Sequence, residues 1–351
     1  MAKPIRVMVV DDSALYRKTI SDVLSESPTV EVVAAAPNGR IALMKIPDYA
    51  PDLITLDMEM PEMDGLATLR ELKTQHPKIK TIVFSAHTEK GADLTFKALR
   101  LGAVDFVTKP TAAGSMENSL NNIREHLKPK VIAFSNLLEP PTRPLPVKEE
   151  VQIKTSAARQ MGPRDVIAIG ISTGGPSSLV TFFEQLPVKM KQAILIVQHM
   201  PPIFTKKLAE QLGRVGTVPV HEAIDSEPIV GGMAYIAPGD FHMTVVRENN
   251  ETSIRINQNP PENYCRPAID VLFRSVAEIY GQRAVGVVMT GMGKDGLKGS
   301  QAMKSAGAAI VAQDEQTSVV WGMPRFIVEN DLADAVSSLD NMFASINNFI
   351  L

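Results

Sequence analysis

Cysteine is almost absent from this chain of 351 residues, which contains only Cys265. A single cysteine excludes an internal disulfide and cannot form a cysteine-based metal site. An excess of one charge is also missing, because 36 Lys and Arg residues face 39 Asp and Glu residues, for a formal net charge of -3. This mixed charge gives no reason to expect nucleic acid or an anionic membrane as a partner.

The sequence also lacks a long apolar run. Its apolar segments have the length of strands and fall short of the roughly 18 residues that cross a membrane. The first residues, Met1 to Arg6, contain no apolar secretion signal. We therefore expect a cytoplasmic protein without membrane insertion. The length of the chain predicts two domains, each large enough to bury a core of its own.

From Ile5 to about Leu127, short apolar strands alternate with amphipathic helices, which is typical of βα units around a parallel sheet. Leucines at 66, 69 and 72 mark one of these helices, and apolar residues at 116, 120, 123 and 127 mark the last. The pattern predicts five strands and five helices. The strands are expected at 6–10, 30–35, 53–56, 81–84 and 103–107.

Charged side chains follow these strands at the points where the strands end. Asp11 and Asp12 follow the first strand, Asp57 follows the third, and Lys109 follows the fifth. Because the carboxyl ends of parallel strands meet at one edge of a sheet, these side chains should lie close together. Three carboxylates beside an ammonium group suit Mg²⁺, and such a site can accept a phosphoryl group as an acyl phosphate.

Several motifs in this half closely resemble those of response-regulator receiver domains, namely 10–13, 56–61, 63–65, 85–86 and 107–110. The resemblance covers the whole segment. It implies that Asp57 is the phosphoacceptor and helps to hold Mg²⁺.

The same resemblance implies roles for the residues around Asp57. Asp11, Asp12 and the main-chain carbonyl of Glu59 would complete the Mg²⁺ site. Ser85 and Lys109 would contact the phosphoryl oxygens. The aromatic switch position is occupied by Phe106, which lacks a hydroxyl group and can act only by packing.

Between 128 and 164 the periodicity decays and prolines become frequent, which predicts a semi-rigid linker. The predicted domains are therefore 1–127 and 165–351. In the second domain strands again alternate with helices, and segments 244–247 and 253–256 predict an inserted β-hairpin. The chain is expected to close with a helix from Val336 to Ile350. The other strands are expected at 166–171, 193–197, 217–220, 233–237, 284–289 and 308–312.

A glycine-rich turn follows the first strand of the second domain. Gly170, Ser172 and Gly174 have the G-x-S-x-G spacing with which a strand-to-helix turn exposes a nucleophilic serine. An ordinary βα turn also favours small residues, so the motif alone leaves both interpretations open. Pro176 stands where a phosphate-binding loop requires lysine, and the glycines do not have the spacing of a dinucleotide-binding motif. Both nucleotide-binding interpretations are therefore disfavoured.

A serine nucleophile requires a histidine base that a third group orients. Of the six histidines, those at 199, 221 and 242 lie in the second domain. His242 begins a predicted hairpin strand and is more easily structural. With the order serine, acid, histidine, the acid would be Asp225 or Asp240, and Asp240 is too close in sequence to His242. The order serine, histidine, acid instead offers Ser172, His199 and Asp295, all at the carboxyl ends of apolar strands.

With this order, the second domain resembles the effector domain of the chemotaxis methylesterase response regulators. Segments 170–176, 198–200, 237–239, 266–270, 291–296 and 318–324 carry the resemblance, which spans both domains. It implies an α/β fold with two doubly wound parallel-sheet domains, a (βα)5 receiver followed by a Rossmann-like methylesterase domain with a β-hairpin insertion. The activity it implies is hydrolysis of glutamate γ-methyl esters on chemoreceptors, with release of methanol, and deamidation of receptor glutamines.

In that mechanism His199 takes the proton of Ser172, and Asp295 holds the imidazole. Main-chain N–H groups near Met292, or at the helix start after Ser172 at Thr173, would bind the oxyanion. Mg²⁺ is expected only in the receiver, with no cofactor for the ester hydrolysis. The expected partners are methyl-accepting chemoreceptors as substrate and a chemotaxis histidine kinase as phosphodonor.

Two other functional classes compete with this one. In the first, the second domain is a phosphorylation-controlled binding module in which Ser172 only forms a turn. The second, a phosphorylated DNA-binding regulator, is disfavoured by the α/β pattern and by the lack of a basic recognition helix. For the methylesterase we expect an inhibitory receiver whose phosphorylation at Asp57 shifts the enzyme toward an active form.

Overall fold

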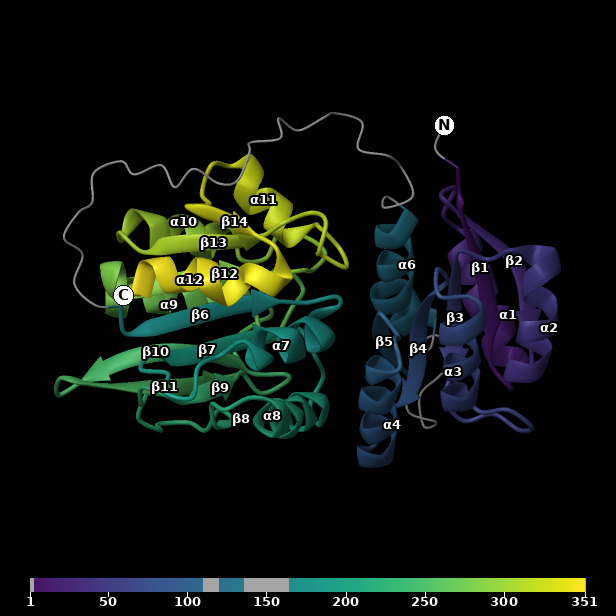
Figure 1. Cartoon of the computed structure of the whole chain (residues 1–351), viewed down its shortest axis with the longest axis horizontal. Helices are drawn as coiled ribbons and strands as arrows, with labels where there is room; N and C mark the ends of the chain where they lie inside the picture. The colour runs from purple at the N-terminus through teal and green to yellow at the C-terminus, as the bar shows by residue number, and fades with distance from the viewer. Residues whose placement is uncertain (1–2, 110–119, 136–163, 351) are drawn as a thin grey trace. The chain divides into compact units, whose positions relative to one another are not determined.

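The computed structural model describes residues 3–109, 120–135 and 164–350. They belong to two compact units, Met1–Leu145 and Pro146–Leu351, and each unit is built on a parallel sheet (Figure 1). Most of the predicted linker, together with position 116 of the last predicted receiver helix and position 110 of a receiver motif, lies outside the described residues. Within the described part of the chain, no helix combines the length and apolar character that a membrane span requires.

The first unit contains a five-stranded sheet in the order β2-β1-β3-β4-β5. This arrangement confirms the predicted receiver fold, in which the chain starts near the middle of the sheet and winds to both sides. Every residue of the central strand β3 is buried, as expected of a parallel strand that is covered on both faces. The strands are β1 (Ile5–Val10), β2 (Val30–Ala36), β3 (Leu53–Asp57), β4 (Lys80–Ala86) and β5 (Asp105–Lys109).

The helices of this unit begin at side chains that accept main-chain hydrogen bonds. Ser13, Asn38, Asp64 and Thr88 each cap the first turn of the helix that follows, which satisfies N–H groups that have no partner inside the helix. The capped helices are α1 (Ala14–Ser25), α2 (Gly39–Tyr49), α3 (Gly65–Gln75) and α4 (Glu89–Arg100).

The last receiver helix continues into the predicted linker. A π-helical segment, η1 (Ile123–Leu127), leads directly into α6 (Lys128–Ser135), and both bury apolar side chains. Because α6 packs against β1 and β2, the first residues of the predicted linker belong to the receiver unit. The domain limits themselves stay a prediction. Lys109 is the last residue of β5, which begins two residues later than predicted.

The second unit contains a seven-stranded parallel sheet in the order β14-β13-β12-β6-β7-β9-β8. Its first strand, β6, lies in the interior, and later strands are added on both sides, so this sheet is doubly wound as well. The strands are β6 (Val166–Ile171), β7 (Ala193–Gln198), β8 (Val220–Glu222), β9 (Ala234–Ile236), β12 (Ala284–Val288), β13 (Ala309–Gln313) and β14 (Ala335–Ser337).

Helices and a hairpin cover this sheet (Figure 1). Ile269, Leu272 and Phe273 of the predicted apolar stripe of α9 are fully buried, and the helix packs against β6, β12 and the hairpin. The hairpin pairs β10 (His242–Glu248) with β11 (Glu251–Asn257) as an antiparallel ribbon, which confirms the predicted insertion. The α-helices are α7 (Gly175–Glu184), α8 (Phe204–Val215), α9 (Ile269–Tyr280), α10 (Leu297–Ser305), α11 (Met323–Glu329) and α12 (Met342–Ile350), with short 3-10 turns at η2 (Gly281–Arg283) and η3 (Leu339–Asn341).

Two element predictions in this unit were wrong. Val336 does not lie in the closing helix but in β14, where it pairs with Ala312 of β13, so the α-helix starts only at Met342. The local spacing of apolar residues predicted a helix here and could not show that this segment pairs with β13 as a further strand of the sheet. The strand predicted at 217–220 begins only at Val220, because Pro219 has no N–H group for a sheet hydrogen bond.

Replacing the core residue Phe273 with alanine should destabilise the second unit. Phe273 is 0% exposed, and removing a buried phenylalanine ring costs about 3 to 5 kcal/mol of unfolding free energy. Urea denaturation followed by the fluorescence of Trp321, the only tryptophan of the chain, measures this change. Val188→Ala, at a site that is 79% exposed, is the control and should change the value by less than about 0.5 kcal/mol. Equal values for the two variants would contradict the assigned core.

Candidate active site

Three neighbouring strands of the second sheet bring the predicted triad together. Strands β12, β6 and β7 are adjacent in the sheet. Ser172 follows β6, His199 follows β7, and Asp295 lies in the turn between β12 and α10. Because parallel strands end at the same edge, residues that are far apart in sequence meet there. Ser172 and Asp295 both reach His199 from the same side of β7, from the neighbouring strand β6 and from the turn after β12, the next strand beyond β6.

A continuous chain of hydrogen bonds links these three side chains. The Nδ1 atom of His199 lies 3.1 Å from the Oγ atom of Ser172, and Nε2 lies 2.8 Å from Oδ2 of Asp295. If the proton resides on Nε2, this nitrogen donates to Asp295 and leaves Nδ1 free to accept from Ser172. The geometry therefore suits transfer of the serine proton to the imidazole.

The turn that carries Ser172 depends on glycines. Gly174 has a φ angle of 76°, in the left-handed region that favours glycine, and α7 starts directly after it. Gly291, from the turn after β12, lies against the serine, since an added Cβ atom would stand 2.8 Å from the Cβ atom of Ser172. A larger residue at 291 would push the two turns apart. The glycines thus permit the close approach of both turns.

Asp295 is held at the amino end of α9. Its carboxylate is 3% exposed and accepts main-chain N–H bonds from Ile269 at 2.7 Å and from Asp270 and Gly296 at 3.0 Å. A helix amino end stabilises negative charge. Burial alone would raise the pKa of Asp295, but the bonds from His199 and the main chain outweigh it, so this pKa is lowered. The carboxylate is therefore ionised near neutral pH.

The pKa of His199 is shifted in the opposite direction. Burial disfavours the charged imidazolium, but the neighbouring Cys265 sulfur and Asp295 carboxylate stabilise it more strongly, so the pKa is raised above its usual value. A general base must be neutral to accept a proton. The active form of His199 consequently becomes populated at higher pH than an unperturbed histidine would require.

Both main-chain groups proposed for the oxyanion site are available. Among the described residues, the N–H groups of Thr173 and Met292 donate to no acceptor, whereas the N–H group of Ser172 donates to Thr290 at 3.0 Å. Met292 is 36% exposed, so it is not a core methionine. An oxyanion binds to N–H groups that are not already used. Their roles stay a prediction.

Sequence reasoning missed two neighbours of the triad, both in the segment before α9. The Sγ atom of Cys265 lies 3.6 Å from Nδ1 of His199, and Nδ2 of Asn263 donates to Oδ1 of Asp295 at 2.8 Å. Cys265 is half-buried, and nothing in the sequence pattern indicated its contact with His199. The segment that contains Asn263 and Cys265 has neither helical nor strand periodicity. The one signal that could have drawn attention to it is its position directly before the motif at 266–270.

The remaining histidines of this unit have structural contacts instead. His242 is buried and bonds through Nε2 to the carbonyl of Pro260 and through Nδ1 to the N–H group of Ala268. His221 pairs with Glu227 at 2.8 Å. Neither hydrogen-bonds to Ser172, so among the described residues His199 is the histidine that does.

The receiver unit brings its predicted charged residues together as well. Asp11, Asp12 and Asp57 each offer an oxygen atom, and these atoms lie within 4.8 Å of one another. The Nζ atom of Lys109 lies 2.7 Å from Asp57 and 2.9 Å from Asp11. This cluster of hard oxygen ligands fits the geometry expected for Mg²⁺.

Burial controls the protonation of this cluster. It raises the pKa of Asp57, an effect that Asp11 reinforces and the ammonium group of Lys109 only partly offsets. The pKa of Lys109 is also raised, because its two carboxylate partners outweigh the burial of its ammonium group. A divalent cation beside Asp57 would favour the ionised form that accepts a phosphoryl group.

The other predicted phosphoryl-site residues line a small cavity beside Asp57. This cavity of about 150 Å³ is bordered by Asp12, Asp57, Glu59, Ser85 and Lys109 among others. The buried hydroxyl group of Ser85 donates to the carbonyl of Gly91 at 2.9 Å. On β5, the strand that ends at Lys109, the side chain of Phe106 is buried, and Nζ of Lys130 lies 5.8 Å from the centre of its ring.

Comparison with known proteins shows the family to which this chain belongs. The family model described as CheB methylesterase matches residues 167–346, and that of the response regulator receiver domain matches residues 7–121. A protein-glutamate methylesterase/protein-glutamine glutaminase from Trichodesmium erythraeum is 45% identical over 339 residues and covers 96% of each chain. This chain belongs to the CheB methylesterase family.

Further relatives support the family assignment. A protein-glutamate methylesterase/protein-glutamine glutaminase from a Nocardioides species is 42% identical and covers 95% of this chain and 92% of that protein. The crystal structure of the Thermotoga maritima CheB methylesterase catalytic domain is 39% identical, covers 52% of this chain and 97% of that chain, and has a TM-score of 0.51. The fold predicted for the CheB methylesterase domain is thereby confirmed.

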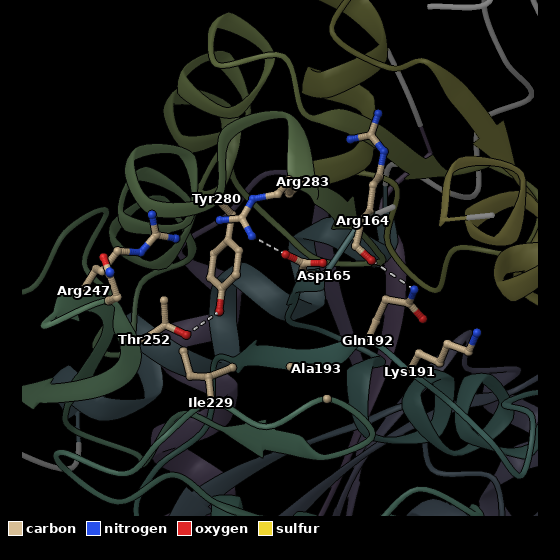
Figure 2. Close-up of a pocket in the computed structure, with 12 residues that line it drawn as sticks. Arg164, Asp165, Lys191, Gln192, Ala193, Ile229, Arg247, Thr252, Tyr280 and Arg283 are labelled. Atoms are coloured by element: carbon tan, nitrogen blue, oxygen red, sulfur yellow. Dashed lines mark hydrogen bonds and ion pairs between the residues drawn. The ribbon is translucent and has the colours of Figure 1, made fainter. Parts of the chain in front are cut away.

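A larger cavity of the CheB methylesterase domain lies away from the triad. Its volume is about 640 Å³, and it is bordered by residues at the amino ends of β6 and β7, such as Asp165 and Gln192. Figure 2 shows Arg283 between Asp165 and the ring of Tyr280 on its wall. Because Ser172 and His199 lie at the carboxyl ends of the same strands, this cavity is separate from the site.

The raised pKa of His199 can be tested by NMR titration of the histidine rings. Removing a neighbour that stabilises the imidazolium should lower this pKa, so Asp295→Asn and Cys265→Ala should both move the His199 midpoint to lower pH. The signals of the other histidines in the same spectra serve as internal controls. An unchanged His199 midpoint in both variants would contradict the described electrostatics.

Proposed function

We propose that this chain is a phosphorylation-regulated hydrolase that removes methyl groups from glutamate γ-methyl esters on chemoreceptors and deamidates receptor glutamines. The observation that carries the proposal is the hydrogen-bonded chain of Ser172, His199 and Asp295 at three adjacent strand ends. The names of the relatives with 45% and 42% identity provide the substrate and both activities.

In the proposed first half-reaction, Oγ of Ser172 attacks the γ-carbonyl carbon while its proton passes to Nδ1 of His199. Asp295, as the ionised partner at 2.8 Å, stabilises the imidazolium that forms. The N–H groups of Thr173 and Met292 stabilise the tetrahedral oxyanion. Collapse breaks the bond to the methoxy oxygen, which takes the proton from His199 and leaves as methanol, so that Ser172 carries an acyl ester.

In the second half-reaction, His199 takes a proton from a water molecule, and the resulting hydroxide attacks the acyl carbon. The bond to Oγ of Ser172 breaks, and the proton returns to the serine as glutamate is released. A glutamine side chain follows the same route, except that its nitrogen takes the first proton and leaves as ammonia. One triad thus serves both activities, and the ester hydrolysis requires no cofactor.

The receiver residues fit a phosphorylation site that controls this activity. The carboxylates of Asp11, Asp12 and Asp57 and the main-chain carbonyl of Glu59 would hold Mg²⁺, which supplies positive charge for phosphoryl transfer. Asp57 is the proposed phosphoacceptor, and Ser85 and Lys109 the proposed phosphoryl contacts. The proposed phosphodonor is a chemotaxis histidine kinase, and the proposed location is the cytoplasm, where kinase and receptor substrate meet.

Ser172→Ala should abolish methanol release from methylated chemoreceptor. Loss of a serine nucleophile lowers kcat by several orders of magnitude, of about 10⁴-fold or more in related triads. Methanol is measured by gas chromatography or with radiolabelled methyl groups, and ammonia release from receptor glutamines is measured alongside. Ser177→Ala changes an exposed serine on the following helix and should retain the activity. Activity of Ser172→Ala near the wild-type rate would refute the assignment of the nucleophile.

A small phosphodonor such as acetyl phosphate should raise the rate of methanol release in the presence of Mg²⁺. Asp57→Asn removes the proposed phosphoacceptor without a large change in shape, so this variant should show the basal rate and no response. Chelation of Mg²⁺ should also remove the response in the wild-type protein. If Asp57→Asn were stimulated as strongly as the wild type, phosphorylation at Asp57 would not be the control.

A further inference from the structure

A strained turn lies next to the triad. Main-chain bonds of 3.1 Å and 2.9 Å join Glu262 and Cys265 in both directions and close a two-residue turn. Its central residues, Asn263 and Tyr264, have φ angles of 52° and 62°, as in a type I′ turn. The left-handed conformation is unfavourable for tyrosine, and strain of this kind persists where surrounding contacts enforce it.

An ion pair anchors the turn to α9. The guanidinium group of Arg274 donates to both carboxylate oxygens of Glu262, at 2.8 Å and 2.5 Å. Such two-point pairs are directional and fix the relative orientation of their groups. The turn therefore has a defined position over the amino end of the helix that holds Asp295. Tyr264 at its tip is fully exposed, so apolar burial does not explain the strained conformation.

Asn263 uses its amide group to bridge two buried carboxylates. Its Nδ2 atom donates to Oδ1 of Asp295 at 2.8 Å and to Oδ2 of Asp270 at 3.0 Å. Asp270 is 1% exposed and takes no part in the proposed reaction. Two carboxylates at such close range repel each other unless donors lie between them. The amide group is the side-chain donor that both carboxylates share.

The main chain already holds Asp295 in place through three N–H groups. Asn263 differs from these groups because it donates to both Asp295 and Asp270, so its contribution is the separation of the two carboxylates. If this amide were lost, the carboxylate of Asp295 would rotate away from Asp270 or share a proton with it. Either change would weaken its bond to Nε2 of His199 and the stabilisation of the imidazolium.

We propose that Asn263 is a positioning residue that keeps the Asp295 carboxylate ionised and directed at His199 by separating it from Asp270. The inference rests on the proposed function, because it assigns Asn263 a role in the same hydrolysis. Asn263 contacts Asp295 and not the reacting atoms, so it acts through the triad. The strained turn and the Arg274–Glu262 pair are the means by which the chain holds the amide group there.

The test uses the full-length chain with Asn263→Gly. Glycine adopts the left-handed conformation without strain, so the turn is preserved while the amide is removed. We expect kcat for methanol release to fall by at least about tenfold, the scale of a misplaced catalytic group, with KM unchanged. The low-field proton NMR signal of the His199 Nε2–H group bonded to Asp295 should shift or disappear, which needs no substrate.

Two further variants sharpen the result. In Asn263→Asp the new side chain has the shape of asparagine, and aspartate also adopts the left-handed conformation of the turn. The amide donor is replaced with a third carboxylate, so kcat should fall further than in Asn263→Gly. The matched control is Asn250→Gly, since Asn250 has a φ angle of 66° in the exposed turn between β10 and β11. It should retain the wild-type kcat, the His199 signal and the urea midpoint.

Each outcome separates the inference from the proposed function. A wild-type kcat in Asn263→Gly would overturn the inference. A lowered kcat together with an unchanged His199 signal and a lowered urea midpoint would also overturn it, because this combination indicates that Asn263 has a structural role alone. If the wild-type protein released no methanol, the proposed function would fail. In that case the His199 signal of the variants would still decide whether Asn263 positions Asp295.

Discussion

The hydrogen-bonded chain from Asp295 through His199 to Ser172 depends on the neighbourhood of three parallel strands. Since β12, β6 and β7 run side by side, their carboxyl ends lie one strand spacing apart, about 4.8 Å. Ser172 and His199 follow neighbouring strands and can therefore meet directly. Strand β6 separates β12 from β7, so it is the turn between β12 and α10 that carries Asp295 to His199. The glycines at 174 and 291 then let the two turns approach, and the apolar core under α9 fixes the sheet that carries them.

Buried charge is the main cost of this arrangement, and local donors offset it. Asp295 is buried at the amino end of α9, where main-chain N–H groups and His199 lower its pKa. The receiver uses the same device at its own sheet edge, with the ammonium group of Lys109 between Asp57 and Asp11. An uncompensated buried carboxylate would take up a proton instead. In both units the chemistry of the site follows from the donors around its carboxylates.

The segment between the hairpin and α9 extends this principle. It supplies Asn263 to the acid of the triad and Cys265 to the base, while Arg274 on α9 anchors it. One short turn thus contacts both of the other members of the triad, Asp295 and His199. This arrangement explains why a chain segment without secondary structure keeps two non-glycine residues in the left-handed conformation.

The sequence by itself determined the α/β class, the two sheets, the hairpin and the candidate triad, because strand ends marked by Asp57, Ser172 or His199 converge by a general rule of parallel sheets. It could not place Val336 in an edge strand, since pairing with β13 depends on a partner distant in sequence. The contacts of Asn263 and Cys265 were likewise decided only by the tertiary structure. They arise where a turn of irregular backbone folds over α9, and neither periodicity nor spacing encodes such a contact.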